Sequence, residues 1–271
     1  MRKLSPEVLV PAQHSGCSQE RVCSQDLVKG KGLRAKGFFI CLLSLQLSAL
    51  SPAVASAAGG TIKGRITFTV AEPGNRVIRM GMDPMCAAAT RGKQVVNEIY
   101  AVGDNNSLGN VFVKVEGTFP ATPVPSQPVE IDQSVCVYRP RVVGARVGQV
   151  LRVKNSDNWL HNVHSDSTKG SDINRSTPQA GMDVKLTLKG EEMLKLGCDV
   201  HRWMTAWVGV VSHPYFAVSE TKGGTFTIAD VPAGSRTITA WHEAFGALTK
   251  AVQVKDGQTV TVDFVYTQKT K

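Results

Sequence analysis

Alternation of apolar and polar residues dominates the chain after residue 58. Residues 61–70 read T-I-K-G-R-I-T-F-T-V, with an apolar side chain at most second positions. The same period of two recurs at 111–115, 182–189 and 259–266. Because successive side chains of a strand point to opposite faces, this pattern predicts strands with one buried face. Only residues 190–196 indicate a turn or two of helix, so we predict an all-β fold.

The spacing of these strands predicts two domains. Residues 58–212 are expected to form a Greek-key sandwich, in which the Pro-rich stretch 120–128 is an extended connection and the polar run 165–181 a long loop. Residues 213–271 contain a further series of short alternating strands and are expected to form a second, smaller β-sandwich domain.

The N-terminal residues resemble a leader rather than a domain. An apolar run at 37–50 follows basic residues and is followed by small residues up to Ala57, which predicts a signal peptide cleaved near Ala57. This run is too short for a membrane span, so we expect none in the mature chain. Residues 1–57 would be removed. The first ~30 of them indicate either a start codon placed too far upstream, with Val28 or Leu33 as the true start, or an unusually long n-region.

The net charge of the chain bears on the class of partner it could bind. The 271-residue chain has a net charge of +9, and loss of the leader removes seven of 31 basic and three of 22 acidic residues, which leaves +5. No cluster of Lys and Arg alternates with aromatic residues, so no nucleic-acid partner is predicted. A mildly basic protein would associate more readily with an acidic protein partner.

Three cysteines remain after export: Cys86, Cys136 and Cys198. In a periplasmic or secreted protein two of them are expected to pair, which leaves one that needs protection from oxidation. We predict a disulfide between Cys86 and Cys136. The alternative is two separate buried thiols.

The unpaired cysteine lies in a segment with metal-ligand spacing. Cys198, His201 and Met204 follow the pattern C-x-x-H-x-x-M, and a second histidine cluster, H-N-V-H, lies upstream at 161–164. A thiolate, two imidazoles and a weak methionine ligand form the donor set of a blue-copper site. A structural zinc site would favour more Cys and His and no Met, and a dinuclear copper site would need a second Cys in the loop.

These two segments resemble the cupredoxins, most closely the amicyanin-like and plastocyanin-like proteins. The resemblance implies one type 1 copper ion per chain, bound by His161, Cys198, His201 and Met204. It also implies that Asn162 links the two ligand segments by hydrogen bonds near the thiolate. His164, three residues along the strand from His161, would point to the opposite face and be a structural or surface residue.

Residues 224–240, G-T-F-T-I-A-D-V-P-A-G-S-R-T-I-T-A, resemble carboxypeptidase regulatory-like domains of transthyretin-like fold. Such domains are usually non-catalytic. Because the remaining chain is short for a complete module, we expect it to take a strand from the first domain, for which residues 60–70 are the candidate.

Together these features predict an exported blue copper protein that carries single electrons between periplasmic partners, such as a cytochrome or a dehydrogenase. The alternative is a copper carrier, assembly factor or interaction protein without electron-transfer turnover. We expect no enzyme activity, because five mature histidines do not supply a second, substrate-binding metal cluster. His201 is expected to be partly exposed at the transfer surface, with Trp203 and Trp207 either in an apolar patch there or in the core.

Overall fold

The computed structural model describes residues 59–69 and 74–267, and the predicted leader and signal peptide (1–57) lies outside them. Strands predominate, which confirms the all-β fold class. In the described part of the chain, helical structure is limited to η1 (Met80–Met82), α1 (Pro84–Ala89) and η2 (Asp104–Asn106). No helix among these residues is long and apolar enough to cross a membrane.

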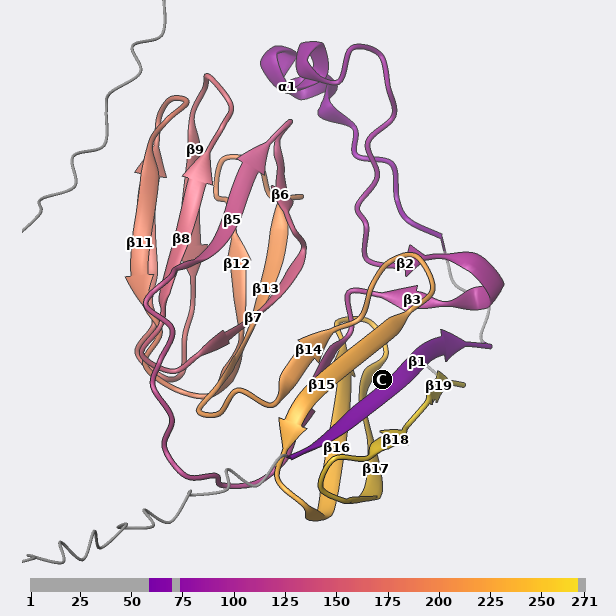
Figure 1. The fold of residues 1–271 in the computed structure, drawn as a ribbon. Coiled ribbons are helices and arrows are strands. Elements are labelled where there is room, and N and C mark those ends of the chain that lie inside the picture. Colours follow the sequence, from indigo (N-terminus) through magenta and orange to yellow (C-terminus); the bar gives the residue numbers. More distant parts are fainter. Residues whose placement is uncertain (1–58, 70–73, 268–271) are drawn as a thin grey trace, which may run out of the picture. The chain divides into compact units, whose positions relative to one another are not determined.

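Strands β5 to β13 form two sheets, which we call the first sandwich (Figure 1). One sheet has the order β10-β9-β12-β13-β7 and the other β11-β8-β5-β6. Strands that are neighbours in a sheet are often distant in sequence, and the pairs β13–β7 and β5–β8 are parallel. The strands are β5 (Val129–Ser134), β6 (Val137–Arg139), β7 (Val142–Arg146), β8 (Val150–Asn155), β9 (His161–Ser165), β10 (Ile173–Thr177), β11 (Asp183–Thr187), β12 (Glu192–Gly197) and β13 (Thr205–Val211).

The core of the first sandwich follows from strand alternation. In β8, Leu151, Val153 and Asn155 are buried, whereas the residues between them are partly exposed. β12 places Leu194 and Leu196 in the same cluster of buried residues, which also contains Cys198 and Met204. The candidate ligands are therefore a continuation of the hydrophobic core at one end of the sandwich.

The second sandwich combines strands from both ends of the chain. Its sheets have the orders β15-β1-β18, with β19 also paired to β1, and β14-β4-β16-β17. β1, drawn in indigo, runs beside the orange and yellow strands β15, β18 and β19 (Figure 1). The strands are β1 (Gly60–Phe68), β4 (Phe112–Val115), β14 (Phe216–Val218), β15 (Thr225–Val231), β16 (Gly234–His242), β17 (Gly246–Val254), β18 (Thr259–Thr261) and β19 (Phe264–Tyr266).

This pairing differs from the expected division at residue 212. β1 and β4 precede the first sandwich in sequence, but they hydrogen-bond with strands that follow residue 213. The C-terminal strands alone would leave the middle of each sheet unpaired, and buried backbone groups need partners. The first sandwich is therefore inserted between β4 and β14, and β1 supplies the strand that we expected the C-terminal module to take.

Two local expectations were wrong. Residues 192–197 form β12 rather than a helical turn, because this stretch pairs with β13 on one side and meets β9 on the other. Within the expected loop 165–181, residues 173–177 form β10, an edge strand paired with β9. β10 is almost entirely polar and largely exposed, so it lacks the apolar alternation by which strands are predicted.

Residues 77–96 form a separate element, which we call the cap segment. An antiparallel bridge between Val77 and Val96 closes its base, and η1 and α1 lie within it. A disulfide joins Cys86 in α1 to Cys136, in the turn between β5 and β6. The cap segment packs its apolar side chains, including that of Met80, against this disulfide and against Trp159 and Trp203. Beyond the cap segment, β2 (Ala101–Val102) and β3 (Leu108–Gly109) form a short hairpin.

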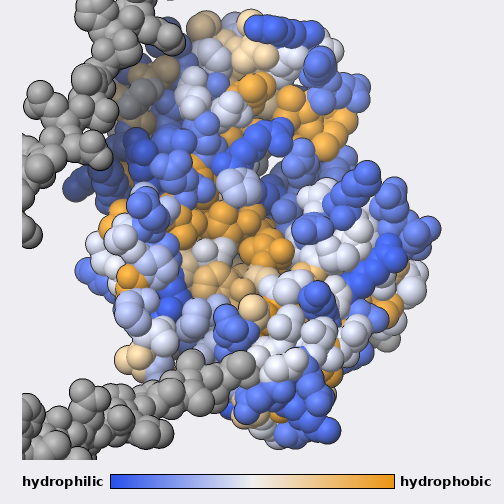
Figure 2. All heavy atoms as spheres, in the orientation of Figure 1, coloured by the Kyte–Doolittle hydropathy of each residue, from blue (hydrophilic) through white to orange (hydrophobic). Residues whose placement is uncertain are grey.

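The outer surface is mostly hydrophilic. Figure 2 shows one face of the molecule, on which apolar residues gather near the middle and polar residues surround them. Among the described residues, the large apolar side chains with more than a third of their surface exposed are scattered along the chain: Val77, Met82, Met85, Val102, Val124, Leu160, Met182, Val200 and Val265. Single exposed apolar side chains of this kind are normal on a protein surface.

Candidate metal centre

Three of the four predicted ligands come from the turn between β12 and β13. Cys198 directly follows β12, and Met204 directly precedes β13. The backbone N–H of Met204 donates to the carbonyl of His201 over 2.9 Å, which closes the turn. His161 is the first residue of β9, which is a sheet neighbour of β12. Sheet pairing thus brings the distant histidine beside the turn.

The donor atoms of three side chains converge. The Nδ1 atoms of His161 and His201 lie 2.9 Å apart, and the Sγ atom of Cys198 lies 3.9 Å from His201 Nδ1. The three side chains offer ligand atoms that all lie within 4.8 Å of one another. Three of the four predicted side chains are therefore brought together, with both imidazoles presenting Nδ1, and Met204 lies in the same buried cluster as Cys198.

All four side chains are shielded from solvent. The exposed fractions are 0% for His161, 3% for Cys198, 1% for His201 and 1% for Met204. The expectation that His201 would be partly exposed was wrong, because the cap segment covers it. Cys86 Sγ lies 3.4 Å from His201 Nε2, and Trp203 packs against the ring of His201 with 5.1 Å between centroids.

Each histidine has a carboxylate on its outer ring nitrogen. Asp157 Oδ2 lies 2.9 Å from His161 Nε2, and Asp83 Oδ2 lies 2.8 Å from His201 Nε2. A carboxylate accepts the proton on Nε2 and so leaves Nδ1 free to bind a metal. This is the arrangement in which a histidine ligand is held in one tautomer and one ring orientation. Neither aspartate was predicted from the sequence.

The electrostatics of the site favour a thiolate. Burial by itself would raise the pKa of Cys198. Hydrogen bonds from His161, His201 and the backbone N–H of Asn162 outweigh burial and lower that pKa to about 6. For His161, burial alone would lower the pKa. The neighbouring Asp157 and Cys198 outweigh burial, so the pKa of His161 is raised. The site is therefore built to hold a negative sulfur beside its two imidazoles.

Asn162 links the two ligand segments, as the resemblance implied. Its backbone N–H donates to Cys198 Sγ over 3.4 Å, and its side-chain Oδ1 accepts the backbone N–H of Asp199 over 2.6 Å. His164 lies apart from the donor cluster. Its Nδ1 is 2.8 Å from Asp199 Oδ1, and its side chain is 34% exposed.

Trp207 lies away from the candidate ligands. Its indole N–H donates to Glu243 Oε2 over 3.1 Å, and its ring packs edge-on against Trp241. Trp203 lies at the site instead, where its indole N–H donates to the carbonyl of Cys136 over 2.9 Å. The two tryptophans thus have different surroundings, and only Trp203 contacts the ring of a candidate ligand.

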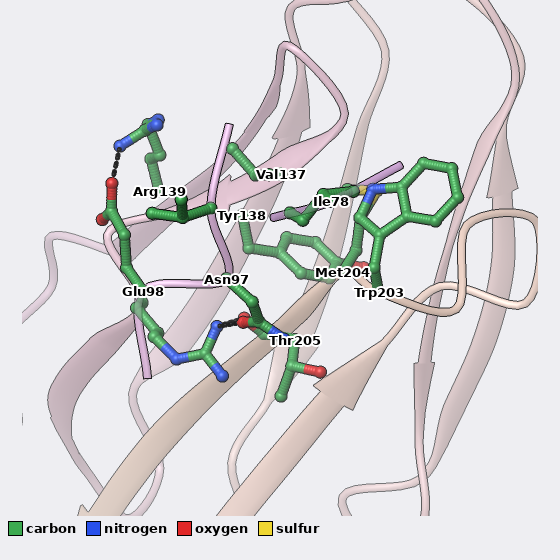
Figure 3. Close-up of a pocket in the computed structure, with 11 residues that line it drawn as sticks. Ile78, Asn97, Glu98, Val137, Tyr138, Arg139, Trp203, Met204 and Thr205 are labelled. Atoms are coloured by element: carbon green, nitrogen blue, oxygen red, sulfur yellow. Dashed lines mark hydrogen bonds and ion pairs between the residues drawn. The ribbon is translucent and has the colours of Figure 1, made fainter. Parts of the chain in front are cut away.

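A small pocket adjoins the ligands on the side of Met204. Figure 3 shows Ile78 of the cap segment near Trp203 and Met204, with the ring of Tyr138 beside Met204 and the Arg139–Glu98 ion pair at the left of the view. The pocket has room for about one water molecule. It is therefore too small to hold an organic substrate next to the candidate ligands.

The donor set fits copper better than the other common metals. Two imidazole nitrogens, one thiolate and one thioether combine donors suited to Cu(II) with donors that favour Cu(I). Two other groupings of potential ligands include Cys86 or Cys136. Both sulfurs belong to the disulfide and are not thiolates, so those groupings do not provide a thiolate ligand.

No family model matches the chain, and no curated protein matches it. Among solved structures it is similar to a purple cupredoxin from Nitrosopumilus maritimus, with 22% identity over 30% of this chain and 98% of that chain and a TM-score of 0.27. It is similar to a Cu(I) form of an amicyanin mutant, with 20% identity over 36% of this chain and 97% of that chain and a TM-score of 0.29.

A Cu-containing nitrite reductase from Thermus scotoductus SA-01 matches 35% of this chain but only 24% of its own length, with 18% identity and a TM-score of 0.28. All these identities and TM-scores are low, and they assign no function to this chain.

Proposed function

We propose that this chain is an exported type 1 copper protein that carries single electrons between protein partners. One copper ion would be held by His161, Cys198, His201 and Met204. The observation that carries the proposal is the convergence of the two Nδ1 atoms and the Cys198 thiolate in a buried site that also contains a methionine. When bound, copper would supply a one-electron couple.

The chain's own residues would keep the site unchanged as the electron arrives and leaves. Both imidazoles are fixed by carboxylates, and Asn162 ties the thiolate segment to β9. Groups held by packing and by outer hydrogen bonds cost little reorganisation. A donor set that compromises between Cu(I) and Cu(II) would therefore be held in one geometry in both states.

Burial of the ligands favours an electron carrier over a copper-delivery protein. A delivery protein must surrender its metal to an acceptor, which needs access to at least one ligand. Here each candidate ligand is at most 3% exposed, and the cap segment that covers His201 is linked by a disulfide to the first sandwich. An electron can cross such a cover, whereas an ion cannot leave without displacing it.

We propose a carrier without enzymatic turnover, with a cytochrome or a dehydrogenase as its partner. Every group of potential metal ligands found among the described residues includes a side chain of this one centre. That supports a single metal without a separate substrate-binding metal. A periplasmic or secreted location would suit both the disulfide and the predicted signal peptide.

Voltammetry of the copper-loaded mature protein tests this proposal. We expect one copper per chain, a reversible one-electron wave over many cycles, and copper retained against a moderate chelator in both oxidation states. The His164→Gln variant serves as a matched control, since it alters a histidine outside the donor cluster. Rapid loss of copper on reduction would instead indicate delivery, and failure to bind copper would rule out both functions.

A further inference from the structure

Resting on the proposed copper site, we infer that Asp83 and Asp157 are positioning residues for its two histidine ligands, and that the Cys86–Cys136 disulfide holds the two carboxylates in register. The two aspartates would fix the orientation of the imidazole rings and keep the reduction potential of the copper low. Neither residue would touch the copper itself.

Asp83 uses both of its carboxylate oxygens. Its Oδ1 accepts the backbone N–H of Cys86 over 2.9 Å, as the N-cap of α1, and its Oδ2 faces His201 Nε2 at 2.8 Å. The carboxylate is therefore oriented by its own helix before it meets the histidine. An asparagine has one oxygen and one NH₂ group, so it could keep only one of these two bonds.

Asp157 repeats this arrangement on the other histidine. Its Oδ2 accepts the backbone N–H of Cys136 over 2.9 Å and also faces His161 Nε2 at 2.9 Å. Its Oδ1 accepts the backbone N–H of Val135 over 2.8 Å. Each half of the disulfide thus donates its backbone N–H to the aspartate that contacts one histidine ligand.

The disulfide closes this chain of contacts. It covalently joins Cys86 to Cys136, and the backbone N–H of each cysteine donates to one of the two aspartates. The sulfur of Cys86 also lies 3.4 Å from His201 Nε2, and Trp159 donates its indole N–H to Cys136 Sγ over 3.1 Å. A covalent link between the two carboxylate anchors would keep both histidines in a fixed relationship although they come from different segments.

The negative charges have a predictable effect on the copper couple. A carboxylate beside a ligand ring stabilises Cu(II) relative to Cu(I), because the oxidised site is more positive. Removing that charge therefore raises the reduction potential. The side chain of Asp157 is 6% exposed and that of Asp83 is 29% exposed, so solvent screens Asp157 less. Replacement of Asp157 is expected to give the larger shift.

The test is voltammetry on the copper-loaded full mature chain carrying Asp83→Asn or Asp157→Asn. Asp166→Asn is the matched control, because it removes one negative charge from a side chain that is 95% exposed and contacts His164 rather than a ligand. We expect each of the first two variants to keep the thiolate-to-copper absorption band. Each should raise the reduction potential by about 59 mV. For a one-electron couple this shift changes the ratio of reduced to oxidised protein about tenfold. The control should match wild type.

A disulfide variant completes the experiment. Replacing Cys86 and Cys136 together by Ser should shift the potential upward as well, because the carboxylates lose their covalent tie. Potentials of the Asp83→Asn and Asp157→Asn proteins equal to that of Asp166→Asn would overturn the inference while the proposed function stands. A wild-type protein without the absorption band would overturn the proposed function first. If Asp157→Asn does not fold, Asp83→Asn decides the question.

Discussion

The Nδ1 atoms of His161 and His201 face each other at 2.9 Å, although 40 residues separate them in sequence. At this distance the two nitrogens cannot both carry a proton, because two N–H groups would point at each other. Both Nε2 atoms face carboxylates that can hold their protons, and this arrangement would leave the Nδ1 lone pairs free in the metal-bound site. The pair is therefore arranged to share one positive ion, which supports a common metal.

The two histidines of H-N-V-H should respond differently to replacement. His161→Gly removes a donor from the cluster, so we expect loss of copper or of its thiolate band, with partial recovery when imidazole is added. His164→Gln should leave the spectrum nearly intact, because its ring lies outside the cluster and contacts Asp199. Copper titration monitored by absorption measures both. Equal loss in the two variants would contradict the ligand assignment.

The disulfide should contribute strongly to stability. Cys86 and Cys136 are 50 residues apart. Closing a loop of that length lowers the entropy of the unfolded chain, which raises the free energy of unfolding by about 4 kcal/mol. Thiol counting on denatured, metal-free mature protein should find one free thiol, that of Cys198. The Cys86→Ser, Cys136→Ser double variant should unfold at lower denaturant concentration.

Cys198→Ser is the control for this measurement, since it removes the free thiol and leaves the disulfide. It should give no free thiol at all. Three free thiols in wild-type protein exported to an oxidising compartment would show that the two cysteines do not pair there.

His242 should make the second sandwich sensitive to acid. Burial of the enclosed ring lowers the pKa of His242 to about 4. This effect outweighs the neighbouring Glu243 and the hydrogen bond from Nε2 to the carbonyl of Ile99 (3.0 Å), both of which raise the pKa. The unfolded chain takes up this proton near pH 6.5, so the free energy of unfolding should fall as the pH drops from about 6.5 to 4. The loss amounts to roughly 3 kcal/mol across that range.

Denaturant unfolding at pH 7 and pH 4.5 measures this effect. Carboxylates contribute their own pH dependence, so the comparison is between wild type and His242→Gln, which cannot titrate at this position. The variant should show a shallower loss of stability on acidification. His164→Gln, which alters a half-buried ring outside the second sandwich, should not reproduce that change. If the free energy of unfolding of His242→Gln falls as much between pH 7 and pH 4.5 as that of wild type, this role for His242 is ruled out.

The candidate ligands could be recognised from the sequence because three of them lie in one turn. Cys198, His201 and Met204 have a fixed spacing, and any fold that forms this turn brings them together. The fourth ligand, His161, depends on the pairing of β9 with β12, but its own motif indicated it. Strand alternation likewise predicted β1, β4, β11 and the C-terminal strands, but not most strands of the first sandwich.

The cap segment over the site, and the two aspartates that face the histidines, could not be predicted in the same way. Asp83 is 118 residues from His201, and no local pattern relates the two. Their contact depends on the path of the cap segment and on the disulfide, both of which are set by tertiary structure. Asp157, four residues before His161, lies in a bend rather than in a strand, so strand periodicity does not indicate its direction. The position of β1 in the second sandwich is likewise set by tertiary structure, because local sequence patterns do not determine the order of strands in a sheet.

The visible absorption spectrum of the copper-loaded mature protein tests the central claim most directly. A thiolate bound to Cu(II) beside two imidazoles and a methionine should give an intense charge-transfer band that disappears on reduction and returns on oxidation. The band should be absent from Cys198→Ser, whereas Met204→Leu should keep copper and the band but change the reduction potential. Copper bound to wild-type protein without this band, or with the same spectrum in Cys198→Ser, would contradict the account.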